Sequence, residues 1–276
     1  MGSFKPLVIT LMALVLGTGC AAQRIRAEKA AAKALISDQD ESKLGLQVKQ
    51  ELEKEGVKYV SDAVVTGYVQ QITNRILPFA RKDRPGVKWN VYTIDDPKTV
   101  NAFATPGGHL YVYSGLILAA DNEAELAGVM AHEAGHVVGR HSARQMVNAY
   151  GLQAVTTMAL GKNPGMVKQL ASNLAATGVL RAHGRSEETE ADDYGVRYSS
   201  AAGYDPKGLM TFFQKLGAQE GKTPALMAWM STHPTSADRV QHIKEQIAKK
   251  RLRGGDLGAE RLAPIKKRLQ AGGEAR

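Results

Sequence analysis

The sequence predicts an α+β domain that is mainly helical and carries a small β-sheet. Most of the chain places apolar residues at helical spacing, whereas residues 87–113 alternate or form short apolar runs bounded by turn residues. The chain has 276 residues, of which 43% are hydrophobic and 23% charged. This length and composition are typical of one substantial globular domain with short appendages, and they exclude a disordered or multispanning protein.

The first 19 residues are predicted to be a signal peptide. Lys5 precedes an apolar run over residues 7–16 that is too short to span a bilayer comfortably. Small residues at 17–19 then lead to Cys20, the only cysteine, so no intramolecular disulfide can form. This arrangement resembles a bacterial lipobox, which implies cleavage before Cys20 and a lipid attached to it. Ala21, directly after the cysteine, resembles a sorting signal for the outer membrane. The alternative to the lipobox is an ordinary secretion signal in which the cysteine is incidental.

Residues 20–42 are charged and rich in alanine, and we expect them to form a tether between the lipid and a domain over residues 43–250. Two helices are predicted between Glu41 and Phe79. Strands are predicted over residues 87–94, 100–104 and 109–113, the last two joined by a hairpin-like turn.

The segment from Asn122 to Val147 is predicted to be one helix that contains the pattern H-E-x-x-H. Asn122 is a candidate N-cap residue with a glutamate three residues later. On a helix, His132 and His136 lie one turn apart on the same face, where both can bind one Zn²⁺. Glu133 can then act as general base toward a water molecule on the metal. The alternative is a chance string on an amphipathic helix.

A catalytic zinc normally takes three protein ligands. The metzincin pattern fails because Ser142 occupies the position of its third histidine, and His141, one residue short, points away on a continuing helix. The next acidic residues lie after Ser186. Among them, Glu188 and Asp192 are spaced i, i+4, so Glu188 can bind the metal while Asp192 accepts the outer N–H of a ligand histidine. The alternative is an acidic, solvated first turn of a helix.

Three motifs together carry a family resemblance. In chain order they are the stretch from Asn101 to Gly108 followed by Ser114-Gly115-Leu116, then His132-Glu133-x-x-His136, and then Arg185-x-x-Glu188-x-x-Ala191-Asp192. From Gly45 to Ile247 the chain resembles the HtpX/Oma-type zinc metallopeptidases, in particular the periplasmic branch typified by BepA and LoiP. The resemblance implies a zincin-type gluzincin domain that binds one zinc ion through His132, His136 and Glu188, with Glu133 as base. No tetratricopeptide domain like that of BepA is expected in this chain.

The resemblance also implies two accessory elements. The stretch Asn101, Ala102, Phe103 and Ala104 resembles the edge strand that pairs with extended substrate, and a purely structural hairpin is the alternative. His233, in a His-Pro loop followed by Arg239, resembles a downstream histidine that approaches the zinc. We interpret it either as a reversible fourth ligand that holds an inactive state or as a hydrogen-bond donor in the transition state. A helix-capping loop histidine is the alternative.

Beyond residue 248 the chain has nine basic and three acidic residues, and residues 251–276 are predicted to be a basic tail. Such a tail can contact anionic lipid or stay solvated. No aromatic residues interleave with the charges, so nucleic-acid binding is not expected.

The sequence therefore predicts a lipoprotein on the periplasmic side of the outer membrane. It is expected to be a zinc endopeptidase, and the resemblance implies that its polypeptide substrates are misfolded or unassembled envelope proteins. A zinc-containing assembly factor or chaperone with little proteolysis is the second hypothesis. The third is a binding module with a structural zinc and four permanent protein ligands.

Overall fold

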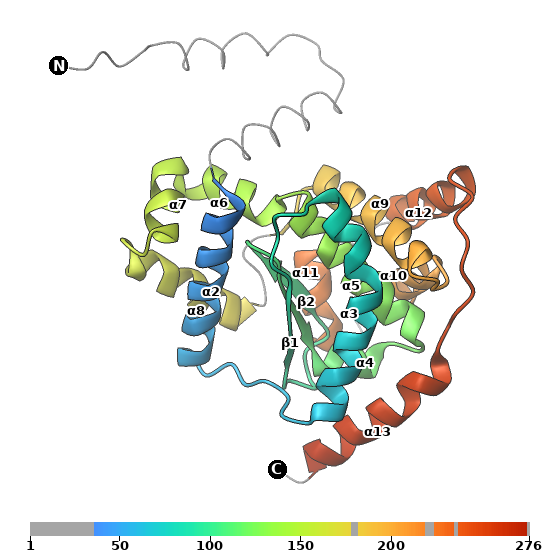
Figure 1. Cartoon of the computed structure of the whole chain (residues 1–276). Helices are drawn as coiled ribbons and strands as arrows, with labels where there is room; N and C mark the ends of the chain where they lie inside the picture. The colour runs from blue at the N-terminus through green and yellow to red at the C-terminus, as the bar shows by residue number, and fades with distance from the viewer. Residues whose placement is uncertain (1–35, 178–181, 219–223, 235–236, 275–276) are drawn as a thin grey trace, which may run out of the picture.

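A three-stranded mixed sheet lies in the middle of the molecule, with helices on both faces (Figure 1). The computed structural model describes residues 36–177, 182–218, 224–234 and 237–274. The strands are β1 (Asn90–Ile94), β2 (Ala102–Thr105) and β3 (His109–Tyr113), in the spatial order β1-β3-β2. β1 pairs parallel to β3 and β2 pairs antiparallel to it, so the predicted hairpin is confirmed and β2 is an edge strand.

The two faces of the sheet build two separate apolar clusters because side chains alternate along each strand. On β3, Leu110 and Val112 pack into the larger cluster, whereas Tyr111 and Tyr113 pack into the smaller one. The larger cluster contains residues of α3 (Ala63–Asp83), α5 (Glu123–Val138), α9 (Arg185–Ala201) and α10 (Gly208–Ala218). The smaller one contains residues of α2 (Asp38–Lys54), α7 (Leu152–Ala159) and α8 (Pro164–Thr177).

The shorter or peripheral helices are α4 (Ser114–Ala119), α6 (His141–Tyr150), α11 (Pro224–Thr232), α12 (Ala237–Lys249) and α13 (Ala259–Glu274). The helix expected from Asn122 to Val147 is wrong as a single element. It breaks into α5 and α6 because Arg140 has φ = 57°, in the left-handed region. The Arg140 guanidinium donates to the Ile36 carbonyl at 3.0 Å and to Asp38 Oδ1 at 2.6 Å, which holds this conformation.

The N-terminal boundary of the folded part differs from the expected tether. α2 begins at Asp38, where Ser37 Oγ accepts the backbone N–H of Asp40 at 3.1 Å as an N-cap. Residues 38–42, predicted to belong to the tether, are therefore part of the domain. Cys20 and the predicted signal peptide lie outside the described residues.

Most of the segment predicted as a basic tail belongs to helix α13, Ala259–Glu274, which packs against the domain near α3 and α4 (Figure 1). Its Leu262 and Ile265 are buried, and the Arg261 guanidinium donates to the buried Glu123 carboxylate at 3.0 Å. An amphipathic pattern inside the basic stretch therefore decides its structure, and the expectation of a solvated tail is wrong for this helix. No helix among the described residues is long and apolar enough to cross a membrane.

Candidate metal centre

Helix α5 carries the H-E-x-x-H pattern into the centre of the domain. Asn122 Oδ1 accepts the backbone N–H of Glu125 at 3.0 Å, so the predicted N-cap is present. The side chains of His132, Glu133 and His136 are at most 1% exposed. Because the two histidines are four residues apart, their rings project from the same face of the helix.

Helix α9 brings the acidic residues onto this face. It begins at Arg185 after Gly184 as N-cap, rather than after the expected Ser186. The two helices approach closely at glycines: a Cβ at Gly135 would lie 2.8 Å from the Tyr194 Cβ, and one at Gly195 would lie 3.3 Å from the His132 Cα. Only this close approach lets short glutamate and aspartate side chains reach the histidines.

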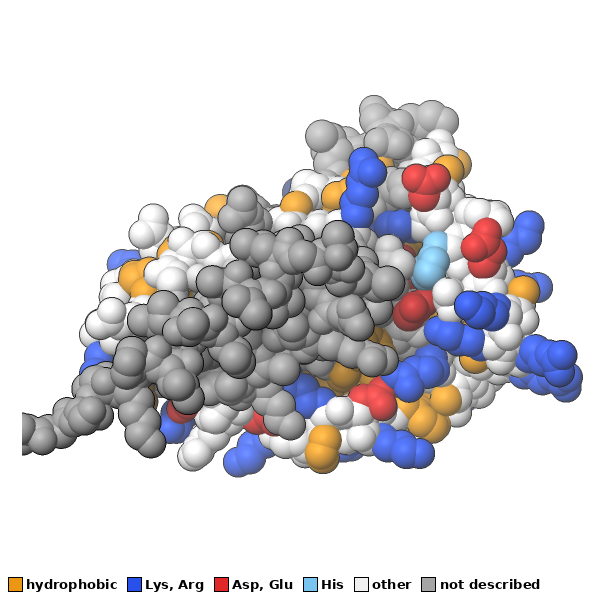
Figure 2. All heavy atoms as spheres, turned by 90° about the horizontal axis from the view of Figure 1, so that it is seen from above, with side chains coloured by type: hydrophobic (Ala, Val, Ile, Leu, Met, Phe, Trp, Pro, Cys, Tyr) orange, Lys and Arg blue, Asp and Glu red, His pale blue; other side chains and the backbone are white. Residues whose placement is uncertain are grey.

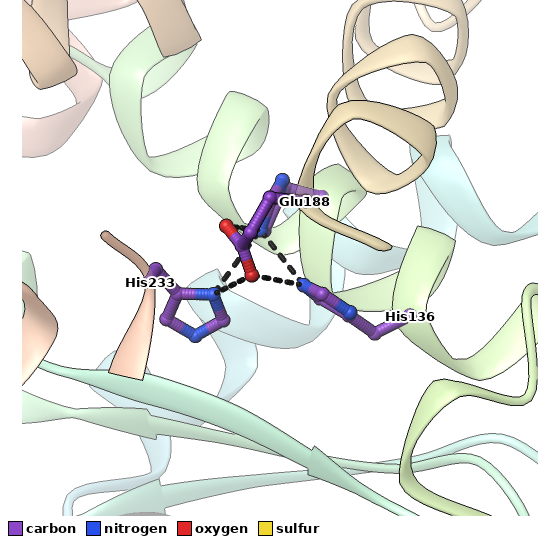
Figure 3. Close-up of side chains that lie close together, drawn as sticks. His136, Glu188 and His233 are labelled. Carbon is purple, nitrogen blue, oxygen red and sulfur yellow. Dashed lines mark hydrogen bonds and ion pairs between the residues drawn. The ribbon is translucent and has the colours of Figure 1, made fainter. Parts of the chain in front are cut away.

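The ligand atoms of four side chains, His132, His136, Glu188 and His233, lie close together. Figure 3 shows three of them, His136, Glu188 and His233, pointing toward one another. His132 Nε2 lies 3.0 Å from His136 Nε2 and 3.3 Å from His233 Nδ1. Glu188 completes the group through its two oxygens, one 3.4 Å from His136 Nε2 and the other 3.7 Å from His132 Nε2. His233 Nδ1 lies 3.1 Å from Glu188 Oε1.

These separations fit a single zinc ion. Ligand atoms at about 2.0–2.1 Å from a tetrahedral zinc lie about 3.3–3.4 Å from one another, and the five distances above range from 3.0 to 3.7 Å around that value. Three nitrogens and one carboxylate are also the donor types that zinc prefers. The residues present therefore suit the metal that the sequence predicts.

Burial and neighbouring charged groups together set the charge states of these residues. Burial lowers the pKa of His132 to about 4 and that of His136 well below its usual value, which favours the neutral rings that bind metals. Burial alone would raise the pKa of Glu188, but His233, His136 and Arg239 outweigh it and hold that pKa well below the usual range. Burial raises the pKa of Glu133 to about 8.

Asp192 lies next to the outer ring nitrogen of His132, and Arg239 lies next to Asp192. Asp192 Oδ1 lies 3.0 Å from His132 Nδ1. The Arg239 guanidinium donates to both oxygens of Asp192, at 2.6 and 2.8 Å, and its third nitrogen lies 2.5 Å from Glu188 Oε2. The structure thus brings together Asp192 and Arg239 with the ligand set, and Arg239 bonds the two carboxylates rather than the metal position.

His141 and His183 were missed as neighbours of the site. His141 Nδ1 lies 2.7 Å from His136 Nδ1, and the His183 ring stacks on His136 with centroids 3.9 Å apart. His141 was expected to point away because the helix was expected to continue. Gly139, a residue type common just after helix ends, was the signal in the sequence that could have placed a break there.

The predicted substrate strand lies at the sheet edge beside α5 and α6. Because Tyr113 N–H donates to the Asn101 carbonyl at 3.0 Å, Asn101 and Phe103 turn their peptide groups toward β3, and those of Ala102 and Ala104 point outward. Ser142 Oγ already donates to the outward carbonyl of Ala104 at 3.0 Å. All four residues from Asn101 to Ala104 are buried.

A pocket of about 350 Å³ adjoins the metal group on the side of α9 and α12. Its lining includes Glu188, Arg239, His183 and Pro234. In the view of Figure 2, acidic and histidine side chains reach the surface among basic ones on the right-hand part of the face. The pocket connects the outer surface with Glu188, which is itself only 1% exposed.

A mainly helical domain with a small sheet, a buried His-His-Glu group and a glutamate beside the first histidine defines the class of zincin-type metalloproteases. Comparison with known proteins identifies a family within this class. Residues 63–247 match the family model described as Peptidase family M48. The chain belongs to this family.

Several relatives carry names that agree with the class. The mitochondrial metalloendopeptidase OMA1 of Schizosaccharomyces pombe is 35% identical over 182 residues, which cover 66% of this chain and 53% of that protein. The metalloprotease LoiP of Escherichia coli is 37% identical over 168 residues, covering 59% and 63%. The beta-barrel assembly-enhancing protease of Escherichia coli is 30% identical over 196 residues, covering 68% and 40%. The similarity therefore spans only about half the length of these relatives.

Proposed function

We propose that the chain is a zinc-dependent endopeptidase. The observation that carries this proposal is the convergence of His132 Nε2, His136 Nε2 and the Glu188 carboxylate. The two nitrogens lie 3.0 Å apart, and each lies 3.4–3.7 Å from one of the two Glu188 oxygens, with Glu133 on the same helix as the histidines. Membership of Peptidase family M48 supports the reaction class.

In this proposal His132, His136 and Glu188 hold one zinc ion, and Glu133 is the catalytic residue. A bound zinc ion supplies Lewis-acid polarisation of the scissile carbonyl and lowers the pKa of the attacking water. Glu133 accepts the proton of that water and delivers it to the leaving amine. Asp192 orients His132, and Arg239 compensates the two buried carboxylates.

The substrate is proposed to pair with the outer edge of β2. The Ala104 N–H and the Ala102 carbonyl point outward, so an extended peptide could bond to both without a side-chain requirement. Because Ser142 Oγ already donates a hydrogen bond to the Ala104 carbonyl, the substrate can pair with only a short segment of the strand. Because Asn101–Ala104 are buried, this edge must be uncovered before a peptide can reach it.

His233 is proposed to hold the site closed. Its Nδ1 lies among the ligand atoms, and its Nε2 lies 3.3 Å from Glu133 Oε1, so one ring occupies both the fourth ligand position and the base. The ring also stacks on the buried Trp229 with centroids 4.3 Å apart. Release of His233 would free Glu133 and a coordination position together.

The proposed substrates are misfolded or unassembled cell-envelope proteins. The name of one relative, the beta-barrel assembly-enhancing protease of Escherichia coli, supports this class. We further propose that a lipid on Cys20 anchors the protein on the periplasmic side of the outer membrane, and that the basic C-terminal segment contacts anionic lipid rather than nucleic acid. An unaltered envelope proteome after loss of the protein would contradict the substrate class.

The decisive experiment measures zinc content and casein cleavage of the full chain beside Glu133→Gln and His233→Ala. We expect one zinc ion in all three, loss of cleavage by at least about 100-fold in Glu133→Gln because the base is removed, and faster cleavage in His233→Ala. Glu53→Gln, the same change on an exposed glutamate of α2, is the matched control. Absence of zinc from the wild-type chain would overturn the proposal.

A zinc-containing assembly factor with little proteolysis is the second candidate. The closed arrangement favours it, because the His233 ring is 1% exposed and lies 3.1 Å from a Glu188 oxygen and 3.3 Å from a Glu133 oxygen. Stoichiometric zinc without cleavage in any variant would support this candidate. A cellular function that survives Glu133→Gln would do the same.

A further inference from the structure

The two ligand histidines differ in what holds their outer ring nitrogens. His132 Nδ1 faces a carboxylate, that of Asp192 at 3.0 Å. His136 Nδ1 instead faces a third imidazole, with His141 Nδ1 at 2.7 Å. A histidine that binds zinc through one nitrogen usually donates its other N–H to a fixed acceptor, which sets the ring orientation.

We propose that His141 is the positioning residue of His136 and that Glu190 in turn orients His141. His141 Nδ1 accepts the N–H of His136, and Glu190 Oε2, 3.3 Å from His141 Nε2, accepts the N–H on the far side of the His141 ring. The inference rests on the proposed function in one respect, since it takes His136 as a zinc ligand.

The positions of the protons follow from the geometry. His136 Nε2 faces the other ligand atoms, 3.0 Å from His132 Nε2 and 3.4 Å from Glu188 Oε1, and must present a lone pair there to bind a metal. A neutral His136 therefore carries its proton on Nδ1. The hydrogen-bond acceptor for this proton, 2.7 Å away, must then be an unprotonated His141 Nδ1. A neutral His141 therefore carries its own proton on Nε2, toward Glu190.

The break between α5 and α6 allows the contact between His141 and His136. The ring of His141 folds back over Gly139, where a Cβ would lie 2.3 Å from His141 Nε2. Arg140, in the left-handed region, makes the turn that reverses the direction of the side chain. His141 is fully buried, so water does not compete for the hydrogen bond.

A second metal site is the rival interpretation, because His136, His141 and His183 also lie close together. Two ligands of one zinc ion lie about 3.3–3.4 Å apart, whereas His136 Nδ1 and His141 Nδ1 are 2.7 Å apart, a hydrogen-bond distance. His183 is also engaged elsewhere, since Gln145 Nε2 lies 2.8 Å from its Nδ1. The geometry therefore favours a hydrogen bond over a shared ion.

The test measures zinc affinity of the full chain by competition with a chromophoric chelator. His141→Leu removes the acceptor and is expected to weaken zinc binding by about 10- to 100-fold. His141→Asn keeps a short side chain with an acceptor oxygen and is expected to recover most of that loss. Glu190→Gln should lower the affinity less and in the same direction. The matched control is His242→Leu, which breaks a histidine–carboxylate contact of 2.9 Å with Asp193 and should leave zinc affinity unchanged.

A spectroscopic measurement separates positioning from packing. In the Co²⁺-substituted protein, proton NMR should show two slowly exchanging ring N–H signals shifted by the metal, one for each ligand histidine. His141→Leu should remove the slow exchange of one signal and leave the other, and Glu190→Gln serves the same test if the leucine variant does not fold.

Three outcomes would overturn the inference. They are equal zinc affinity in the wild type and His141→Leu, an equally large loss in His141→Asn, and two zinc ions in the wild type of which His141→Leu removes one. A wild-type chain that holds no zinc would instead remove the proposed function and this inference with it.

Discussion

The candidate metal centre has two unlike halves. Behind His132 lies a charged set, in which Asp192 receives two hydrogen bonds from Arg239. Behind His136 lies a mostly neutral set, in which His141 lies between His136 and Glu190. The charged half comes from α9 and α12, which pack against each other, whereas the neutral half depends on a turn between α5 and α6.

This difference predicts that removing a residue from one half of the centre has a different consequence from removing a residue from the other half. A buried charged set is strongly destabilised when one partner is removed, because the remaining charges lose their compensation. A neutral set loses only a hydrogen bond and a fixed orientation, so its loss should affect zinc binding more than folding. The following predictions test this contrast, beginning with the largest expected effect.

The largest effect is expected from Arg239→Met. Asp192 and Glu188 would remain buried without their guanidinium partner, so we expect the free energy of unfolding to fall by about 3–5 kcal/mol, measured by urea denaturation with excess chelator present. Arg197→Met breaks an ion pair with Asp83 whose side chains are 43% and 28% exposed, and should cost less than about 1 kcal/mol. Equal losses in the two variants would mean that burial does not distinguish these pairs.

An intermediate effect is expected from Gly139→Ala on the neutral half. The added Cβ would lie 2.3 Å from His141 Nε2 and push the ring out of place, so we expect a loss of about 1–3 kcal/mol in stability together with weaker zinc binding. In Gly67→Ala, on α3, the new Cβ meets no atom within 4 Å, and we expect a gain of about 0.5–1 kcal/mol without a change in zinc affinity. Unchanged zinc affinity in Gly139→Ala would argue against the dependence on the turn.

The smallest effect is expected at Asp38, which holds Arg140 in place. Partial burial alone would raise the pKa of Asp38, but hydrogen bonds from Arg84 and Arg140 outweigh it and lower the pKa from its ordinary value of 3.8. A lowered folded-state pKa stabilises the protein above the ordinary value, and this contribution disappears as the pH falls through the folded-state pKa. Asp38→Asn should therefore cost less than about 1 kcal/mol at about pH 7 and progressively less below pH 3.8.

The check is urea denaturation of both proteins across that pH range. Asp40→Asn, on the same turn of α2, controls for the loss of a carboxylate that does not contact Arg140. A difference between wild type and Asp38→Asn that grows in acid would contradict the assigned sign.

Much of the centre could be predicted from local spacing. His132 and His136 share a helix face because they are four residues apart, and the same spacing singles out Glu188 and Asp192 on the next acidic helix. The hairpin of β2 and β3 also follows from local signals, since glycines at 107 and 108, with φ of 83° and 91°, form its turn. These features depend on contacts within a helix or a hairpin, which the sequence encodes directly.

The tertiary structure decided the other half. Whether His141 faces His136 depends on the left-handed conformation of Arg140, which is stabilised by Asp38 and Ile36 about a hundred residues earlier in the chain. The packing of α13 was equally hidden, because a basic composition says little about whether Leu262 and Ile265 find an apolar surface. Local spacing determined which side chains could bind a metal, and long-range packing determined which groups hold them in position, because backbone direction after a helix end is set by whatever contacts it.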